Sequence, residues 1–258
     1  MSRVDDDGGL AGGGVDADRL RGGLLRLIQG VAVVVVALLG ASVAVGAVVP
    51  ALVAAGVVAD GGVGAEYAGM VVQFVSFMTV VGLFVVGAGR TELLAASVPD
   101  RRDALLFAGG YVALLVLQFV SVWLLGIAGV STGTNRVVEL GRETPVLFLY
   151  LVPLSVLLVG PAEELLFRGT VQGLLRDSWG PRAAVAAASL VFGAIHYWSV
   201  VGGGPVERLL YVAVAAVLGA VLGMLYEVTG NLVVPALAHG AYNATLFVIQ
   251  YLNATGGV

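Results

Sequence analysis

Two histidines and a pair of adjacent glutamates are the residues of this sequence best suited to chemistry. His196 and His239 are its only histidines, and each lies in a stretch apolar enough to cross a membrane. Glu163 and Glu164 lie in a third such stretch. An ionisable side chain in hydrocarbon costs at least about 2.5–3.5 kcal/mol on insertion scales, so these positions favour a functional explanation. The pattern predicts a catalytic or ion-handling site inside a membrane.

Glutamate, histidine and asparagine can together hydrolyse a peptide bond in two ways. In the first, a glutamate takes a proton from water, the water attacks an amide carbonyl, and histidine and asparagine donate hydrogen bonds to the oxyanion. In the second, Zn²⁺ is held by His196, His239 and either Glu163 or Glu164, with a fourth position open for water. Both schemes remain open on the residues alone.

The spacing within the first motif separates the two glutamates. Glu164 and Arg168 are four residues apart, in the favourable order for a pair on one helix face. Glu163 points about 100° away from Glu164. One carboxylate is thus expected to pair with arginine while its neighbour stays free. A lone pair of this kind is usually structural, but two consecutive glutamates within a span favour a function.

Two further motifs repeat the spacing of four residues. Phe192 precedes His196, and His239 precedes Asn243, so each pair shares a helix face. Packing or a hydrogen bond between helices would explain either motif alone. The tight connection Ser178–Pro181 makes the spans on either side antiparallel. Glu163 lies 17 residues before Gly180 and His196 lies 16 after it, so both are about 25 Å from the turn, at the same level.

Composition predicts an all-α, polytopic membrane helical bundle. Of the 258 residues 59% are hydrophobic and 12% charged, which excludes an ordinary soluble domain. The absence of cysteine and lysine excludes thiol nucleophiles, disulfides and Schiff-base chemistry. About seven transmembrane helices are expected, with a range of six to eight. The apolar runs cover residues 24–58, 67–89, 104–130, 145–176, 181–201, 208–228 and 232–252.

Arginine placement predicts a multi-pass protein of the cell membrane with a cytoplasmic N-terminus and an external C-terminus. Ten arginines fall on the inner side of this topology and three on the outer side, in agreement with the positive-inside rule. The inner ones are Arg3, Arg19, Arg21, Arg26, Arg90, Arg101, Arg102, Arg168, Arg176 and Arg182, and the outer ones are Arg136, Arg142 and Arg208.

Four regions follow from the composition along the chain. Residues 1–22 are expected to form a disordered, acidic, glycine-rich cytoplasmic tail. Residues 23–140 hold the N-terminal transmembrane helices, residues 141–252 form a transmembrane core with all three motifs, and residues 253–258 are a tail.

The three motifs resemble those of the CPBP intramembrane proteases, which include type II CAAX prenyl endopeptidases and bacteriocin self-immunity proteins. That family carries EExxxR, FxxxH and HxxxN on successive membrane helices. This chain matches each of them, in order, within about residues 145–250. The matching residues are Glu163, Glu164 and Arg168, then Phe192 and His196, then His239 and Asn243.

The resemblance implies a helical-bundle protease whose site opens to the cytoplasmic side through a cavity between helices. Glu163 would be the general base and His196 its partner in holding the attacking water. His239 and Asn243 would form the oxyanion site. Glu164 with Arg168 would support the site, and Phe192 would pack it. The partners implied are the lipid bilayer and a membrane-attached or prenylated protein or peptide, with no nucleic acid.

Two other functions compete with proteolysis. A proton-coupled transporter could use the same glutamates and histidines as a relay, but it predicts repeat symmetry and paired broken helices, which the sequence lacks. A non-catalytic membrane scaffold or immunity protein would need no intact site, whereas both glutamates, both histidines and the asparagine of a hydrolase site are present here.

Overall fold

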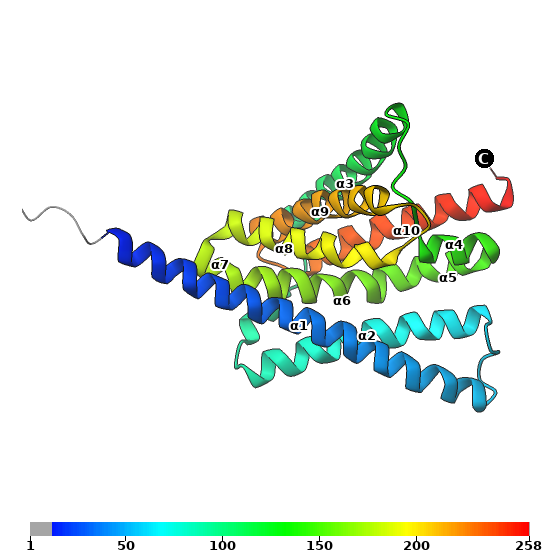
Figure 1. Cartoon of the computed structure of the whole chain (residues 1–258), viewed down its shortest axis with the longest axis horizontal. Helices are drawn as coiled ribbons and strands as arrows, with labels where there is room; N and C mark the ends of the chain where they lie inside the picture. Colours follow the sequence, from blue (N-terminus) through cyan, green and yellow to red (C-terminus); the bar gives the residue numbers. More distant parts are fainter. Residues whose placement is uncertain (1–11, 258) are drawn as a thin grey trace, which may run out of the picture.

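The computed structural model describes residues 12–257, which form an almost entirely helical bundle (Figure 1). The predicted all-α polytopic fold is confirmed. The longer helices are α1 (Gly12–Ala54), α2 (Val63–Gly87), α3 (Arg101–Ile127), α8 (Pro181–Ile195), α9 (Pro205–Thr229) and α10 (Val233–Thr255). The shorter ones are α4 (Arg136–Glu143), α5 (Val146–Leu154), α6 (Gly160–Glu164) and α7 (Gly173–Trp179). Strands β1 (Thr134–Asn135) and β2 (Val200–Val201) form one antiparallel pair.

Each of the seven predicted apolar runs contains a helix, but only five helical segments of the described chain are both long and apolar enough to cross a membrane. α8 has 15 residues, fewer than the roughly 20 that a span needs. α10 is long enough, but polar residues such as His239 and Asn243 lower its hydropathy. The five are Ala17–Ala54, Val63–Gly87, Arg101–Ile127, Val146–Trp179 and Pro205–Thr229.

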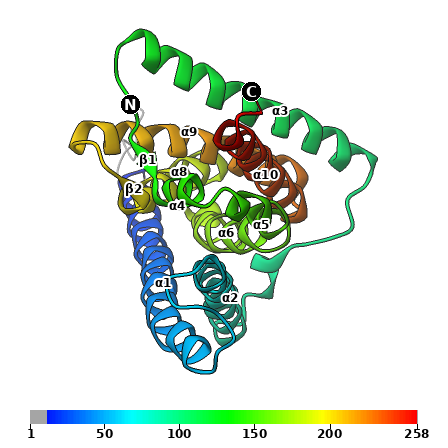
Figure 2. The same cartoon turned by 90° about the vertical axis from the view of Figure 1, so that its right-hand side faces the viewer.

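The helices that carry the motifs lie in the middle of the bundle. In Figure 2, α6, α8, α9 and α10 are grouped between the α1–α2 hairpin on one side and α3 on the other. α3 crosses α9 and α10, with Leu114 packed against an apolar cluster from both. Residues on inward faces of α6, α8 and α10 are therefore shielded from lipid on two sides.

One continuous helical rod runs from Val146 to Trp179 and contains two π-helical segments. They cover Ser155–Val159 and Leu165–Gln172, and the short helix α6 lies between them. Pro161 has no N–H to donate to the preceding turn, and its ring crowds the carbonyl there, which favours a wider turn. Such π segments occur often at functional sites. Here they flank the two consecutive glutamates.

α10 approaches this rod so closely that backbone touches backbone. A Cβ atom on Gly240 would lie 2.7 Å from the Ser155 carbonyl oxygen and 2.7 Å from the Val156 Cα. A Cβ atom on Gly160 would lie 2.4 Å from the Ala236 carbonyl oxygen. Only glycine permits this spacing, which places the neighbouring His239 beside the glutamates.

We expect Gly240→Ala to lower the melting temperature and to reduce any activity that depends on His239. Backbone atoms cannot rotate away from the new methyl group, so the two helices must separate, at a cost of about 1–3 kcal/mol. Thermal unfolding of the purified protein measures the change. Gly82→Ala is the matched control, because no atom lies within 4 Å of a Cβ there. Equal stability of the two variants would contradict the close-packing argument.

The predicted N-terminal tail (residues 1–22) and C-terminal tail (residues 253–258) have wrong inner boundaries, because helices extend into both. Residues 12–22 belong to α1, whereas residues 1–11 lie outside the described chain. A helix nucleated by the long apolar run adds further residues at little cost, which outweighs the poor propensity of the glycines. At the other end α10 continues through residues 253–255 and stops at Gly256, whose left-handed conformation (φ 73°) ends the helix.

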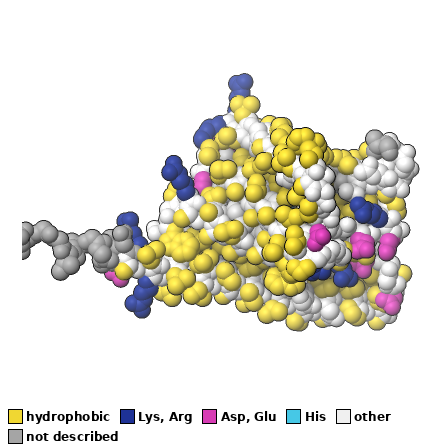
Figure 3. Space-filling view, turned by 45° about the horizontal axis from the view of Figure 1, so that its top comes forward, with side chains coloured by type: hydrophobic (Ala, Val, Ile, Leu, Met, Phe, Trp, Pro, Cys, Tyr) yellow, Lys and Arg dark blue, Asp and Glu magenta, His cyan; other side chains and the backbone are white. Residues whose placement is uncertain are grey.

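Charged side chains gather near the two ends of the bundle. In Figure 3 most arginines in view lie at the end where α1 begins, most acidic residues lie near the other end, and the surface between them is hydrophobic. Arg168 is the exception, because it is buried inside the bundle instead of lying at the inner surface. The arrangement suits a membrane protein, and the orientation of the termini stays a prediction.

Candidate active site

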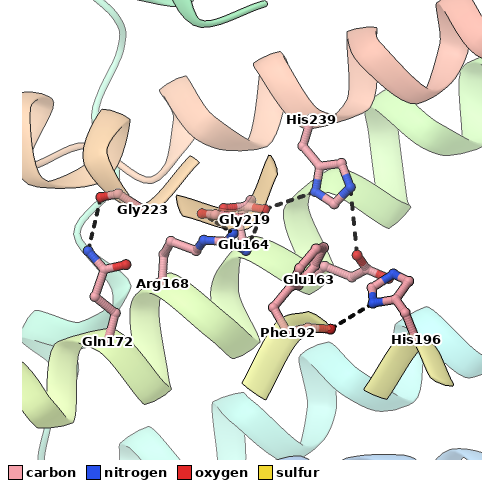
Figure 4. Close-up of polar contacts among 9 residues, drawn as sticks. All are labelled: Glu163, Glu164, Arg168, Gln172, Phe192, His196, Gly219, Gly223 and His239. Carbon is pink, nitrogen blue, oxygen red and sulfur yellow. Dashed lines mark hydrogen bonds and ion pairs between the residues drawn. The ribbon is translucent and has the colours of Figure 1, made fainter. Parts of the chain in front are cut away.

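The imidazole of His239, from the third motif, lies beside the glutamate pair of the first motif (Figure 4). His239 Nδ1 lies 2.9 Å from Glu164 Oε1, and His239 Nε2 lies 3.7 Å from Glu163 Oε2. All three side chains are buried, with Glu164 at 0% and Glu163 at 9% exposure. The convergence of α6 and α10 that the sequence predicts is therefore present.

Glu164 is paired with Arg168, as the spacing predicts. Arg168 Nη1 donates to Glu164 Oε1 at 3.0 Å, and Nη2 donates to the Gly219 carbonyl oxygen at 2.8 Å. The guanidinium also lies over the Phe192 ring, 4.8 Å from its centroid. Removing a charge from water is costly unless it is paired and hydrogen-bonded. Arginine therefore neutralises one glutamate and fixes it in place.

His239 is held from both sides, which the sequence did not indicate. Glu164 is an acceptor, so His239 Nδ1 carries the proton that joins them. The opposite edge of the ring then faces Glu163. At 3.7 Å the second contact is longer than a hydrogen bond. Glu163 is the carboxylate without an arginine partner, so it keeps the capacity to take a proton.

His196 lies where α8 ends and a 3-10 turn (His196–Ser199) begins. Its Nδ1 donates to the Phe192 carbonyl oxygen at 2.7 Å, which leaves Nε2 as the free nitrogen. The Phe192 ring lies 4.6 Å from the His196 ring and 5.9 Å from the His239 ring, centroid to centroid. Phe192 thus packs against both imidazoles, which fits the packing role that the motif implies.

Two glycines let α9 approach this site. A Cβ on Gly193 would lie 2.6 Å from the Val212 carbonyl oxygen, so α8 and α9 approach closely at this glycine. A Cβ on Gly219 would lie 3.1 Å from the Phe192 ring. Asn243 lies one turn beyond His239 on α10 and is partly buried. Its oxyanion role and the individual roles of the other motif residues stay predictions.

Sequence reasoning missed a ladder of polar contacts that continues from Arg168 toward α7. Gln172 Nε2 donates to the Gly223 carbonyl oxygen at 3.0 Å and to Glu227 Oε1 at 2.9 Å. Arg176 pairs with Glu227 at 3.0 Å. A signal was available, because polar residues recur every fourth position from Glu164 to Arg176. The ladder locks the rod against α9 (Figure 4).

A second missed group lies on the other side of His196. Asn135 Nδ2 donates to Tyr211 Oη at 3.0 Å and lies 3.4 Å from Ser199 Oγ. The Tyr211 ring lies 6.2 Å from the His196 ring. No motif or spacing signals this group, since Asn135 lies in β1 and Tyr211 in α9, two segments far apart in the sequence.

The donor set for a metal ion is not assembled by these residues. In residues 12–257 no three His, Asp or Glu side chains lie grouped so that they could hold one ion. His239 Nδ1 is already bonded to Glu164, and His196 Nδ1 to Phe192. Zn²⁺ therefore stays an alternative that the sequence alone suggests.

Two comparisons with known proteins match part of this chain. Uncharacterized protein YpbD of Bacillus subtilis (strain 168) is 35% identical over 108 residues, which are 42% of this chain and 47% of YpbD. The chain thus spans about half the length of this curated relative. No solved structure matches the chain. Residues 145–245 match the family of type II CAAX prenyl endopeptidase Rce1-like proteins, and they hold all three motifs. The similarity to the Rce1-like family thus concerns residues 145–245, in the C-terminal half of the chain.

Proposed function

We propose that this protein is an intramembrane endopeptidase that hydrolyses a peptide bond of a membrane-attached or prenylated substrate. The observation that carries the proposal is the inequality of the two glutamates. Glu164 is bound by Arg168 and His239, whereas Glu163 has no arginine and lies on the more exposed side of the pair. A carboxylate without an arginine partner, 3.7 Å from the His239 imidazole, suits general base catalysis.

In the proposed reaction Glu163 takes one proton from a water molecule, and the water oxygen attacks the carbonyl carbon of the scissile bond. His196 Nε2 helps to hold that water. Asn243 donates a hydrogen bond to the oxyanion of the tetrahedral intermediate, and His239 donates a second one from Nε2 in its doubly protonated form, which keeps the Nδ1 bond to Glu164. When the C–N bond breaks, Glu163 returns the proton to the leaving amine. The products are a carboxylic acid and an amine, so the reaction consumes one water.

Glu164 and Arg168 act by positioning His239. A carboxylate on one nitrogen of an imidazole fixes the ring orientation, as in other catalytic pairs. Arg168 fixes that carboxylate through a second bond to α9.

A cleavage assay on the purified protein in detergent tests the proposal. Prenylated peptides and total membrane proteins are the substrates, and His196→Ala and His239→Ala are expected to lose turnover while the thermal unfolding stays cooperative. Full activity in both variants would overturn the mechanism. Metal analysis of the same sample, with chelator titration, tests the Zn²⁺ alternative.

A further inference from the structure

An apolar groove lies between the first half of α3 and the second half of α9, and its lining residues are outside the three motifs. Its volume is about 300 Å³, at the lower end of the range for ligand clefts, about 300–1,000 Å³. One face of each helix lines it, with Leu105, Gly109 and Ala113 from α3 and Val221, Met224 and Val228 from α9. Gly109 keeps the groove open, because no atom of the described chain lies within 4 Å of a Cβ there.

The groove opens sideways, toward the hydrocarbon of a bilayer. α3 and α9 are both long and apolar enough to cross a membrane, and α3 is the outermost helix on its side of the bundle (Figure 2). Leu105, Met224 and Val228 are 70%, 54% and 50% exposed. From Leu105 to Ala113 the groove follows α3 for about 12 Å, close to the depth of one leaflet, about 15 Å. An empty hollow forfeits van der Waals contacts, so a hydrocarbon chain is its natural occupant.

Two arginines stand at one mouth of this groove. Arg101 and Arg102 begin α3, one turn before Leu105, and both are exposed. Arg102 Nη2 donates to the Val228 carbonyl oxygen at 3.3 Å, and Val228 lines the groove. A guanidinium has five N–H donors, so Arg102 keeps others for the oxygens of a phosphate, which arginine binds with two parallel hydrogen bonds.

The two aspartates beside these arginines are engaged elsewhere. Asp100 caps α3 by accepting a hydrogen bond from the Asp103 backbone N–H at 2.8 Å. The Asp103 carboxylate is buried and accepts a hydrogen bond from Asn231 Nδ2 at 3.0 Å. Both carboxylates are therefore held to the start of α3 and to the connection after α9. The arginines remain as the exposed cations at the mouth of the groove.

We propose that this groove binds one acyl chain of a phospholipid whose anionic headgroup pairs with Arg101 and Arg102. The apolar lining accepts the chain, and the cationic mouth selects a phosphate that no amine of the same lipid neutralises. Phosphatidylglycerol has this chemistry, whereas phosphatidylcholine has the same chains and a zwitterionic headgroup. The inference is independent of the proposed peptidase function.

A lipid in this groove would add a connection between α3 and α9. Side-chain hydrogen bonds tie the middle of α3 to α10 instead: Tyr111 Oη lies 2.8 Å from Thr245 Oγ1, and Tyr242 Oη donates to Gln118 Oε1 at 2.8 Å. Toward α9 the groove offers apolar surface and the bond from Arg102. Because the bound lipid would contact both helices in the folded state only, it should raise the melting temperature.

Lipid titration of the purified full chain in detergent tests the site. Native mass spectrometry measures the affinity for phosphatidylglycerol and phosphatidylcholine of the same chain length, and thermal unfolding is followed in parallel. We expect phosphatidylglycerol to bind more tightly and to raise the melting temperature more. The double variant Arg101→Gln/Arg102→Gln should lose about fivefold in phosphatidylglycerol affinity for each arginine and leave phosphatidylcholine unaffected. Arg19→Gln/Arg21→Gln, at exposed positions of α1, is the matched control and should bind as the wild type does.

A second variant tests the groove itself. Gly109→Leu should fill it without a clash and weaken the binding of phosphatidylglycerol, while the lipid-free melting temperature stays near that of the wild type. Gly126→Leu is its control, because that glycine of α3 is equally open and lies outside the groove. If Gly109→Leu fails to fold, Gly109→Val takes its place.

Three results would each overturn the proposal. The first is equal affinity of the wild type for the two lipids. The second is unchanged phosphatidylglycerol affinity in the double arginine variant. The third is phosphatidylglycerol binding that depends on the arginines but not on Gly109, since the headgroup would then bind at the surface with no chain in the groove.

Discussion

Glu163→Gln is expected to lower kcat/KM for peptide hydrolysis by about 10²–10⁴-fold, the range that general base catalysis contributes. Glutamine fills the same volume but cannot accept a proton from water. Glu163 is buried and makes only the 3.7 Å contact with His239, so the substitution removes little packing. The cleavage assay measures the loss, and the melting temperature should stay close to that of the wild type.

The control for this prediction is Glu139→Gln on the exposed surface of α4, which removes the same charge far from the motifs. It should leave both activity and stability unchanged. If Glu163→Gln keeps wild-type kcat/KM, the base is another group and the inequality of the two glutamates has no catalytic meaning. Glu164 would then be the next residue to test.

The sequence predicted the helical bundle and the convergence of its motifs because each rests on a short-range rule. Spacing of four residues gave the Glu164–Arg168 pair and the contact between Phe192 and His196, both of which are present. The extreme hydrophobic composition fixed the fold class. Those inferences depend only on helix geometry and on the cost of burying charge.

Other features depend on contacts between distant segments, which periodicity does not encode. An ideal α-helix turns consecutive glutamates about 100° apart. In the structure both nevertheless lie close to His239, with π segments on either side of α6. Likewise the Asn135–Tyr211 bond joins β1 to α9, and β1 is a two-residue strand that no alternation of polar and apolar residues predicts.

Arg168→Leu is expected to cause the largest loss of stability, about 3–5 kcal/mol, because it leaves the Glu164 charge buried without its cation. The Gly219 carbonyl would lose a hydrogen bond as well. Thermal or denaturant unfolding in detergent measures the change. Arg176→Leu is the matched control on the same rod: its side chain is 52% exposed in its pair with Glu227, and exposed pairs contribute about 0–1 kcal/mol.

A double variant separates charge from packing at this position. Glu164→Gln removes the charge that Arg168 neutralises, so Arg168→Leu should cost less stability in that background than in the wild type. Activity should stay low in the double variant, because His239 Nδ1 no longer meets an anionic partner. Equal costs of Arg168→Leu in the two backgrounds would mean that Arg168 stabilises the bundle through α9 and Phe192 instead of through Glu164. In that case Arg168 would have no role in positioning Glu164, and the helix backbone alone would set the positions of the two glutamates.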